Sequence, residues 1–370
     1  MTQNFCNYLT NQYRFVYGVL QPCCWYTKTQ DLSEGPEAVE KYKQELYTIN
    51  DWVPECNFCK VREDKGMHSP RYEANKPTPV PVEWVTGQGI SLEFQIDRDC
   101  NGACLICGDW NSTTWDQYTT QTINKKTFSI KNNEDNVEVW LRQIYETVKF
   151  DKVRHITFLG GEPLRTDTHF RILKEVKKVQ DLKKVRVTYI TNGSAKPTTE
   201  QLALWSELAH LNLHFSLDAI GEHFNYLRWP LQWSQVEKNL QYIVGLNLPN
   251  LGITGSYTLT PFNIFYHDRY DAWAHEFFKD TKHNPKNIFR QPFMANGVMS
   301  LAALPPKLTA IVKKKYQMDV TDNNDHTVDK CIPSYNALKY KNFMEHIEYH
   351  DKHRKLEWRK IFPEIQEYFK

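Results

Sequence analysis

Short apolar runs alternate with longer amphipathic stretches along the chain from about residue 90 onward. Six runs have the length and composition of strands: residues 90–96, 155–160, 185–191, 211–217, 251–259 and 287–293. Six stretches have helical spacing: residues 136–149, 168–180, 199–209, 234–245, 268–281 and 306–317. Strands and helices that alternate in this way are typical of right-handed crossover units around a parallel sheet. The pattern predicts an α/β fold, a partial (β/α)6 TIM barrel rather than a closed barrel of eight units.

The two ends of the chain break this alternation. The N-terminal segment is rich in Cys, Pro, Tyr and Trp, and it ends in KPTPVPVEW at 76–84, whose prolines favour an extended linker. The tail has the polar stretch TDNNDHT at 321–327, followed by a charged helical pattern over 335–360. We therefore expect three parts: a small N-terminal domain at 1–84, the partial barrel at 85–318 and a helical C-terminal extension at 319–370.

Charge and hydropathy exclude little. Forty-six basic and 44 acidic residues leave a net charge of +2 over 370 residues, which gives no reason to expect nucleic acid or an anionic membrane as a partner. No long apolar run predicts a membrane helix, and the opening MTQNFCNYLTNQYRF lacks the charged-then-apolar order of a secretory signal. We expect a cytoplasmic protein.

The nine cysteines are more informative than charge and hydropathy, because their number is odd and they cluster in sequence. In a reducing compartment such thiols are better explained as metal ligands or catalytic groups than as disulfides. Cys100, Cys104 and Cys107 lie in DRDCNGACLICGDWNS, directly after the first strand of the repeat, where parallel α/β folds carry their chemistry. A structural zinc or a common iron–sulfur cluster takes four protein ligands, and this loop supplies three. Either a four-iron cubane with one open iron or a zinc completed by a distant His or Cys fits the spacing.

Three further polar stretches end successive predicted strands: Gly160-Gly161-Glu162-Pro163, Thr191-Asn192-Gly193, and Ser216-Leu217-Asp218 with Arg228 downstream. Taken alone, each has an ordinary structural reading, as a turn or as the cap of the next helix. Their order is more informative, because parallel strands end at one rim of a sheet, and so these stretches are predicted to surround the cysteine loop.

The three-cysteine loop after a strand resembles the cluster loop of the radical S-adenosylmethionine (SAM) superfamily. The resemblance implies that the loop holds a 4Fe-4S cluster whose open iron binds SAM. It also implies that Glu162 and its turn hold the methionine amino group, that the 191–192 strand end lines the adenosine, and that Arg228 and its partners contact the ribose and carboxylate. The implied SAM-contacting residues are Gly160, Gly161, Glu162, Pro163, Thr191, Asn192, Ser216, Asp218 and Arg228. No catalytic acid or base is assigned.

Four more cysteines, Cys6, Cys23, Cys56 and Cys59, precede the barrel and match the ligand count of either a structural zinc or a complete four-iron cluster. FCNYLTNQYRFVYGVLQPCCW and CNFCKVREDKGMHSPR are similar to the auxiliary-cluster motifs of SPASM and twitch radical SAM proteins, in the subfamily with an N-terminal twitch domain. This resemblance implies a second, auxiliary 4Fe-4S cluster. The Gly-x4-Cys spacing selects Cys23, so Cys24 is expected to be a small buried residue.

Cys331 lies beyond the predicted barrel and has no partner in the sequence around it. We expect a core thiol there, with an extra ligand or a substrate-facing group as the alternative.

The resemblance implies an enzyme, an oxidoreductase or transferase. It would cleave SAM reductively to a 5'-deoxyadenosyl radical that takes hydrogen from a peptide or protein side chain, while the auxiliary cluster assists electron transfer. Such an enzyme needs an electron donor, such as flavodoxin or ferredoxin. Two other functions stay open: modification of a small metabolite or nucleotide by the same chemistry, and a zinc-stabilised binding protein built on a barrel scaffold.

Overall fold

The computed structural model describes residues 5–64, 66, 69–75, 89–118, 134–283, 292–295, 297–315 and 332–369. Within these ranges nine strands form a sheet in the order β3-β2-β1-β4-β5-β6-β7-β8-β9. The strands are β1 Gln12–Val16, β2 Val19–Gln21, β3 Gln30–Asp31, β4 Ile90–Gln95, β5 Val153–Phe158, β6 Arg186–Thr191, β7 His210–Ser216, β8 Leu251–Leu259 and β9 Pro292–Met294. The helices are α1 Asn7–Asn11, α2 Pro36–Thr48, α3 Asn57–Asp64, α4 Pro70–Asn75, α5 Glu134–Thr147, α6 Thr168–Val179, α7 Thr199–Ser206, α8 Gly221–Leu227, α9 Trp233–Gly245, α10 His267–Phe278, α12 Pro306–Lys315, α14 Ala337–Arg354 and α15 Trp358–Ile361.

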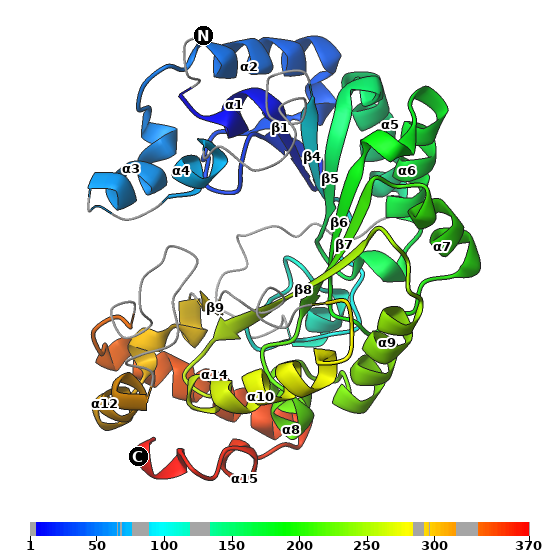
Figure 1. The fold of residues 1–370 in the computed structure, drawn as a ribbon. Coiled ribbons are helices and arrows are strands. Elements are labelled where there is room, and N and C mark those ends of the chain that lie inside the picture. Colours follow the sequence, from blue (N-terminus) through cyan, green and yellow to red (C-terminus); the bar gives the residue numbers. More distant parts are fainter. Residues whose placement is uncertain are drawn as a thin grey trace.

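The predicted α/β fold with a partial barrel is confirmed. Each strand from β4 to β9 pairs in parallel with the next, and a helix lies between consecutive strands in the chain. Figure 1 shows α5, α6, α7 and α9 along one face of the sheet. Of the last predicted strand, only 292–293 fall in the described residues, where β9 pairs with β8.

The sheet has two unlike faces, which explains the alternating pattern of the strands. Side chains on the helix-covered face are apolar and buried, among them Phe94, Phe158 and Phe215. The opposite face is polar and half-buried, and it includes His155 and His214. His155 lies between the hydroxyls of Ser91 and Thr188, at 3.3 and 3.2 Å, and His214 Nδ1 lies 2.9 Å from Thr254 Oγ1.

The N-terminal segment shares this sheet. β1 pairs in parallel with β4, from Gln12 beside Ser91 to Val16 beside Gln95, and β2 and β3 extend the sheet in antiparallel pairs. The predicted domain limits at 84 and 318 lie in the ranges 76–88 and 316–331, outside the described residues, and they stay predictions.

The C-terminal tail is helical where it is described. Ile347 of α14 and Trp358 of α15 are fully buried in the main core, and Figure 1 shows these helices at the end of the molecule opposite the N-terminal helices. Among the helices that the structure describes, none has both the length and the apolar character needed to cross a lipid bilayer.

Candidate functional site

The three-cysteine loop follows β4 and runs beside the segment that follows α8. The backbone N–H of Ala103 donates to the carbonyl of Trp229 at 2.6 Å, and that of Leu105 donates to Leu227 at 2.8 Å. Ala103 and Leu105 are buried, as expected for a site shielded from water, and Cys104 between them is buried as well. The loop is therefore held from one side by the 227–229 segment, which contains Arg228.

Hydroxyl groups just after the last cysteine hold the loop from the other side. Ser112 Oγ donates to the carbonyl of Gly102 at 2.6 Å, and Thr114 Oγ1 donates to the carbonyl of Cys100 at 2.5 Å. Ser112 is fully buried, so its hydrogen bond is shielded from water. These two contacts hold the backbone at Cys100 and Gly102, between which the loop begins.

Hydrogen-bond donors already face two of the three sulfur atoms. The Gly102 N–H lies 3.4 Å and Asn192 Nδ2 lies 3.8 Å from Cys100 Sγ, and Arg228 Nη1 lies 3.7 Å from Cys104 Sγ. Such donors favour the thiolate form, which is the form that binds metal.

Burial, in contrast, disfavours the thiolate form of these cysteines. It raises the pKa of Cys100 and of Cys107 to about 12, so these thiols become thiolates only when a positive charge, such as bound iron, compensates. The three cysteine thiols and the N–H groups that face them thus fit an iron–sulfur cluster. Among the described residues no three His, Cys, Asp or Glu side chains are grouped as ligands of a single metal ion. A cubane takes each thiolate on a different iron, so its ligands need not converge on one point.

The turn at 160–163 packs directly on the backbone that leads into the cysteine loop. The N–H groups of Gly161 and Glu162 donate to the carbonyls of Asp97 and Asp99, at 2.9 and 2.7 Å. Gly160 has a φ of +125°, and a Cβ on Gly161 would lie 2.3 Å from the Asp99 carbonyl oxygen. Glycine is therefore required at both positions.

Glu162 joins two of the predicted SAM-contacting stretches. Its buried carboxylate accepts hydrogen bonds from Thr191 Oγ1 at 2.7 Å, the Asn192 N–H at 2.6 Å and the Leu164 N–H at 3.2 Å. Burial raises the pKa of Glu162 although these three donors oppose the shift. The carboxylate therefore fixes the end of β6 beside the 160–163 turn, a role in addition to the one implied for the methionine amino group.

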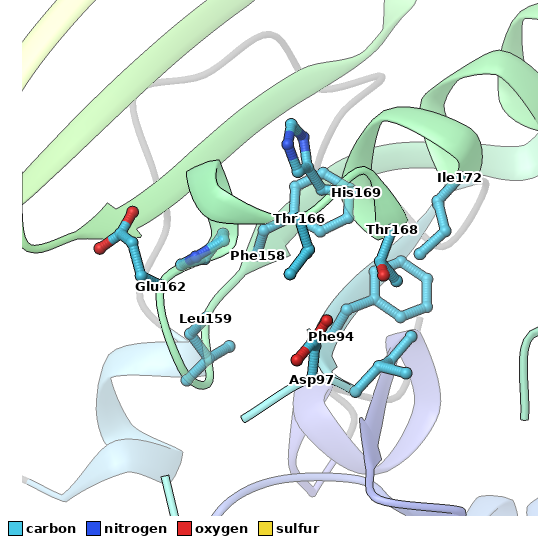
Figure 2. A pocket seen from close by; sticks show the side chains of 11 residues that line it. Phe94, Asp97, Phe158, Leu159, Glu162, Thr166, Thr168, His169 and Ile172 are labelled. Atoms are coloured by element: carbon cyan, nitrogen blue, oxygen red, sulfur yellow. The ribbon is translucent and has the colours of Figure 1, made fainter. Parts of the chain in front are cut away.

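Pro163 begins a short 3-10 turn, Pro163–Arg165, and a small pocket lies next to it, between β4, β5 and α6. Figure 2 shows Glu162 at one end of this pocket and Ile172 at the other. Most of the wall is apolar, and none of the three loop cysteines lines it. The pocket therefore lies behind the 160–163 turn and apart from the thiols.

Asp218 and Arg228 form a buried ion pair at 2.5 Å. Asp218 has a φ of +61°, and its other carboxylate oxygen accepts the Thr258 N–H at 2.7 Å. Burial acts to lower the pKa of Arg228, but Asp218 and Cys104 outweigh it and raise that pKa. Asp218 does not cap the next helix, because the N-cap residue of α8 is Ile220 and no side chain caps this helix. Ser216 ends β7 on the half-buried polar face, beside Ser256 of β8.

The four N-terminal cysteines come together at one pocket, although they belong to three separate segments of the chain. Its wall is formed by Cys6, Tyr8, Leu9, Cys23, Trp25, Tyr26, Glu55, Cys56, Phe58, Cys59 and Arg71. Burial raises the pKa of Cys6 to about 11 and that of Cys56 to about 12. As in the loop, these thiols need a compensating positive charge to bind as thiolates.

The structure corrects the prediction for Cys24, which is exposed and not buried. The chain turns directly after β2, so that Cys23 lines the pocket while Cys24 is exposed and does not line it. Cys331 lies outside the described residues, and its predicted role stays a prediction.

One side chain that contacts the cysteine loop was missed from the sequence. Arg354, the last residue of α14, donates from Nη2 to the carbonyl of Ala103 at 2.7 Å. Its guanidinium also lies over the rings of Trp115 and Tyr118, which follow the loop. The serines and threonines after Cys107 were a visible signal for contacts that hold the loop, but no local pattern marks a residue 251 positions away from Ala103.

Comparison with protein families finds a match in the central part of the chain. Residues 95–264 match the Radical SAM superfamily. The matched range contains the three loop cysteines, the 160–163 turn and the Asp218–Arg228 pair. A comparison with curated proteins gives no significant match.

Solved structures similar to the chain include native anSMEcpe with bound AdoMet, at 17% identity and a TM-score of 0.38, covering 72% of this chain and 62% of that one. Native anSMEcpe with bound AdoMet and Cp18Cys peptide is also 17% identical, with a TM-score of 0.38, and covers 61% of this chain and 59% of that one. Native anSMEcpe with bound AdoMet and Kp18Cys peptide is 18% identical, with a TM-score of 0.37 and coverage of 72% and 61%. The chain spans less than two thirds of the length of each of these proteins.

Proposed function

We propose that the chain is a radical SAM enzyme whose SAM-binding cluster is held by Cys100, Cys104 and Cys107. The observation that carries the proposal is the set of three buried or half-buried thiols on the loop after β4, with donors facing two sulfurs, inside the range that matches the Radical SAM superfamily. When bound, the cluster and SAM supply a 5'-deoxyadenosyl radical that takes a hydrogen atom from the substrate. The chain's own residues hold the loop, orient SAM and exclude water.

The proposed SAM contacts follow from the charge of each group. SAM carries an ammonium and a carboxylate, and Glu162 and Arg228 offer the opposite charges at the rim beside the cysteine loop. Both side chains already have partners in the protein, which fixes their position before any ligand binds. Asn192 contacts Cys100 Sγ and Asn101 Oδ1, and so it connects the proposed adenosine side of the site with the loop.

For the second site we propose an auxiliary 4Fe-4S cluster on Cys6, Cys23, Cys56 and Cys59, as in twitch proteins with an N-terminal auxiliary domain. The convergence of all four thiols on one pocket supports this assignment. Four protein ligands complete such a cluster, so electron transfer fits it better than direct binding of substrate. An external donor such as flavodoxin or ferredoxin would supply electrons. The eight free cysteines of the described residues suit a reducing compartment such as the cytoplasm.

We propose a peptide or protein side chain as substrate, and a small metabolite or nucleotide as the second candidate. The polar face of the sheet supports both, because it offers neutral hydrogen-bonding groups to a polar molecule. Burial lowers the pKa of His155 and of His214 to about 4, so both imidazoles are uncharged at neutral pH. Such groups match peptide amides as well as the hydroxyls and amides of a metabolite.

The test begins with anaerobic reconstitution of the full chain. About eight irons per chain are expected for two four-iron clusters, whereas stoichiometric zinc without iron would support a binding protein instead. Reduced protein with SAM should then release 5'-deoxyadenosine. Transfer of deuterium into that product from labelled peptides, or from labelled metabolites, identifies the substrate class. Reconstituted iron without any 5'-deoxyadenosine would refute the proposed enzyme.

A further inference from the structure

The C-terminal helix α14 ends against the three-cysteine loop. Its last residue, Arg354, is 7% exposed, and its Nη2 donates to the carbonyl of Ala103, the residue directly before Cys104. Because α14 also packs into the main core through Phe343 and Ile347, the position of the guanidinium is fixed by the fold. A segment far from the matched range in sequence thus contacts the cysteine loop of the candidate site.

Three aromatic rings surround the guanidinium. Its Cζ atom lies 5.6 Å from the ring centroid of Trp115, 5.3 Å from that of Tyr118 and 5.1 Å from that of Trp229. Trp115 and Tyr118 belong to the turn that follows the cysteine loop, and Trp229 follows Arg228. The planar cation therefore lies where the loop, this turn and the 227–229 segment meet, with its charge over ring faces that attract it.

Among the described residues Arg354 forms no ion pair with a carboxylate, and Tyr118 is a hydrogen-bonding side-chain partner of its guanidinium. Its Nε has no hydrogen-bond partner. The acid nearest in sequence, Asp351, uses its two oxygens for the Tyr226 hydroxyl and the Trp358 N–H, at 2.7 and 2.8 Å. Arg228 differs, because its charge is paired with Asp218. A buried cation without a carboxylate partner is well placed to meet an anion that arrives with a ligand.

The other titratable groups beside Arg354 do not supply that anion. His346 and His350 of α14 are held neutral, since burial lowers the pKa of His346 to about 4 and that of His350 to about 2. Burial lowers the pKa of Arg354 itself, whereas Tyr118, Tyr226 and Cys104 favour its charged form. Of these three, Cys104 is the group proposed to become an anion in the working protein, as a thiolate of the bound cluster.

We propose that Arg354 is a positioning residue for the three-cysteine site, which fixes the loop through the Ala103 carbonyl and supplies the countercharge for a cluster bound at Cys104. The inference rests on the proposed radical SAM function and assigns the C-terminal helix a part in it. Because a positive charge stabilises the more negative of two oxidation states, Arg354 favours the reduced cluster, the state from which SAM is cleaved.

The experiment compares full-length R354Q and R354K with the unchanged protein and with K352Q, which removes an exposed charge from the same helix. Each protein is reconstituted, its iron is counted, and the fraction of reduced cluster is measured by electron paramagnetic resonance at fixed solution potentials. The signal that changes on addition of SAM identifies the cluster of the loop. In R354Q we expect normal iron and a ratio of reduced to oxidised cluster that is about tenfold lower at a given potential, equivalent to a shift of about 59 mV for one electron. R354K and K352Q should stay close to the unchanged protein.

Equal reduced fractions in R354Q and the unchanged protein would overturn the inference, as would equal changes in R354Q and R354K, because the latter retains the charge. If R354Q cannot load the cluster while R354K can, the requirement for charge is supported. Loss of the cluster or of folding in both R354Q and R354K would show that Arg354 acts only through the shape of its side chain, and this result would overturn the inference. Failure of the proposed function is distinguishable, because the unchanged protein would then have no SAM-responsive signal.

Discussion

The chain carries two cysteine sites that are built in opposite ways. The three thiols of the barrel site stand within eight consecutive positions, on one loop held by Ser112, Thr114 and Arg354. The four thiols of the N-terminal site come from three segments, and only the fold brings them to one pocket. The barrel site is therefore local in sequence and supplies three of the four ligands of a cubane. The N-terminal site depends on tertiary structure and supplies all four.

The two sites also differ in the charge that surrounds them. Arg71 lines the N-terminal pocket and is paired with Glu63 at 2.5 Å, and both side chains are partly exposed. The barrel site has three buried arginines: Arg98 is paired with Asp116, Arg228 is paired with Asp218 at 2.5 Å, and Arg354 has no carboxylate partner among the described residues. The barrel site therefore has one arginine charge without a carboxylate partner, which the N-terminal site lacks among the described residues. Such a charge suits a site that holds a cluster in its reduced, more negative state.

The largest effect that separates the sites is expected from replacing all three loop cysteines. C100A/C104A/C107A removes every protein ligand of the SAM-binding cluster, so 5'-deoxyadenosine should fall to background while about half of the iron remains at the N-terminal site. The reciprocal variant, C6A/C23A/C56A/C59A, should lose the other half and still cleave SAM. Iron analysis and chromatography of the nucleoside products measure both. Continued 5'-deoxyadenosine release by the loop variant would contradict the assignment.

The adjacent cysteines Cys23 and Cys24 offer a sharper test of the N-terminal site alone. C23A removes a pocket-lining ligand and should lower iron by up to about four per chain, whereas C24A alters an exposed thiol and should leave iron unchanged. Since the two changes are chemically identical and one residue apart, a difference between them reports only which thiol faces the cluster. Equal iron in the two variants would remove Cys23 from the ligand set.

These two sites also show how far the sequence reaches. The strands from 90 onward were predictable because each is an apolar run between amphipathic helices, and the barrel site because its cysteines and the 160–163 turn follow strand ends. The short strands β1, β2 and β3 were not, because they exist through pairing with β4 and with one another. The Asp218–Arg228 pair was missed for a related reason: each residue was assigned to SAM, and nothing local predicts that the two side chains meet.

The two arginine–carboxylate pairs allow a matched comparison of stability. D218N leaves Arg228 buried without a countercharge and should lower the free energy of unfolding by about 3–5 kcal/mol. E63Q at the partly exposed Arg71 pair should cost about 1 kcal/mol or less, because water screens the remaining charge. Denaturant unfolding of the metal-free proteins measures both values. Similar losses in the two variants would mean that the barrel site is not the more deeply desolvated one.

The smallest expected effect concerns the hydroxyls that hold the loop. S112A removes a buried donor and leaves the Gly102 carbonyl without this partner, which should cost about 1–3 kcal/mol of stability. S206A, at an exposed serine whose Oγ donates to the Ala203 carbonyl at 2.7 Å, should change stability by less than about 0.5 kcal/mol. Because neither serine is a metal ligand, both variants should bind the full amount of iron. If S112A is as stable as S206A, the loop takes its shape from the bound cluster rather than from the hydroxyls.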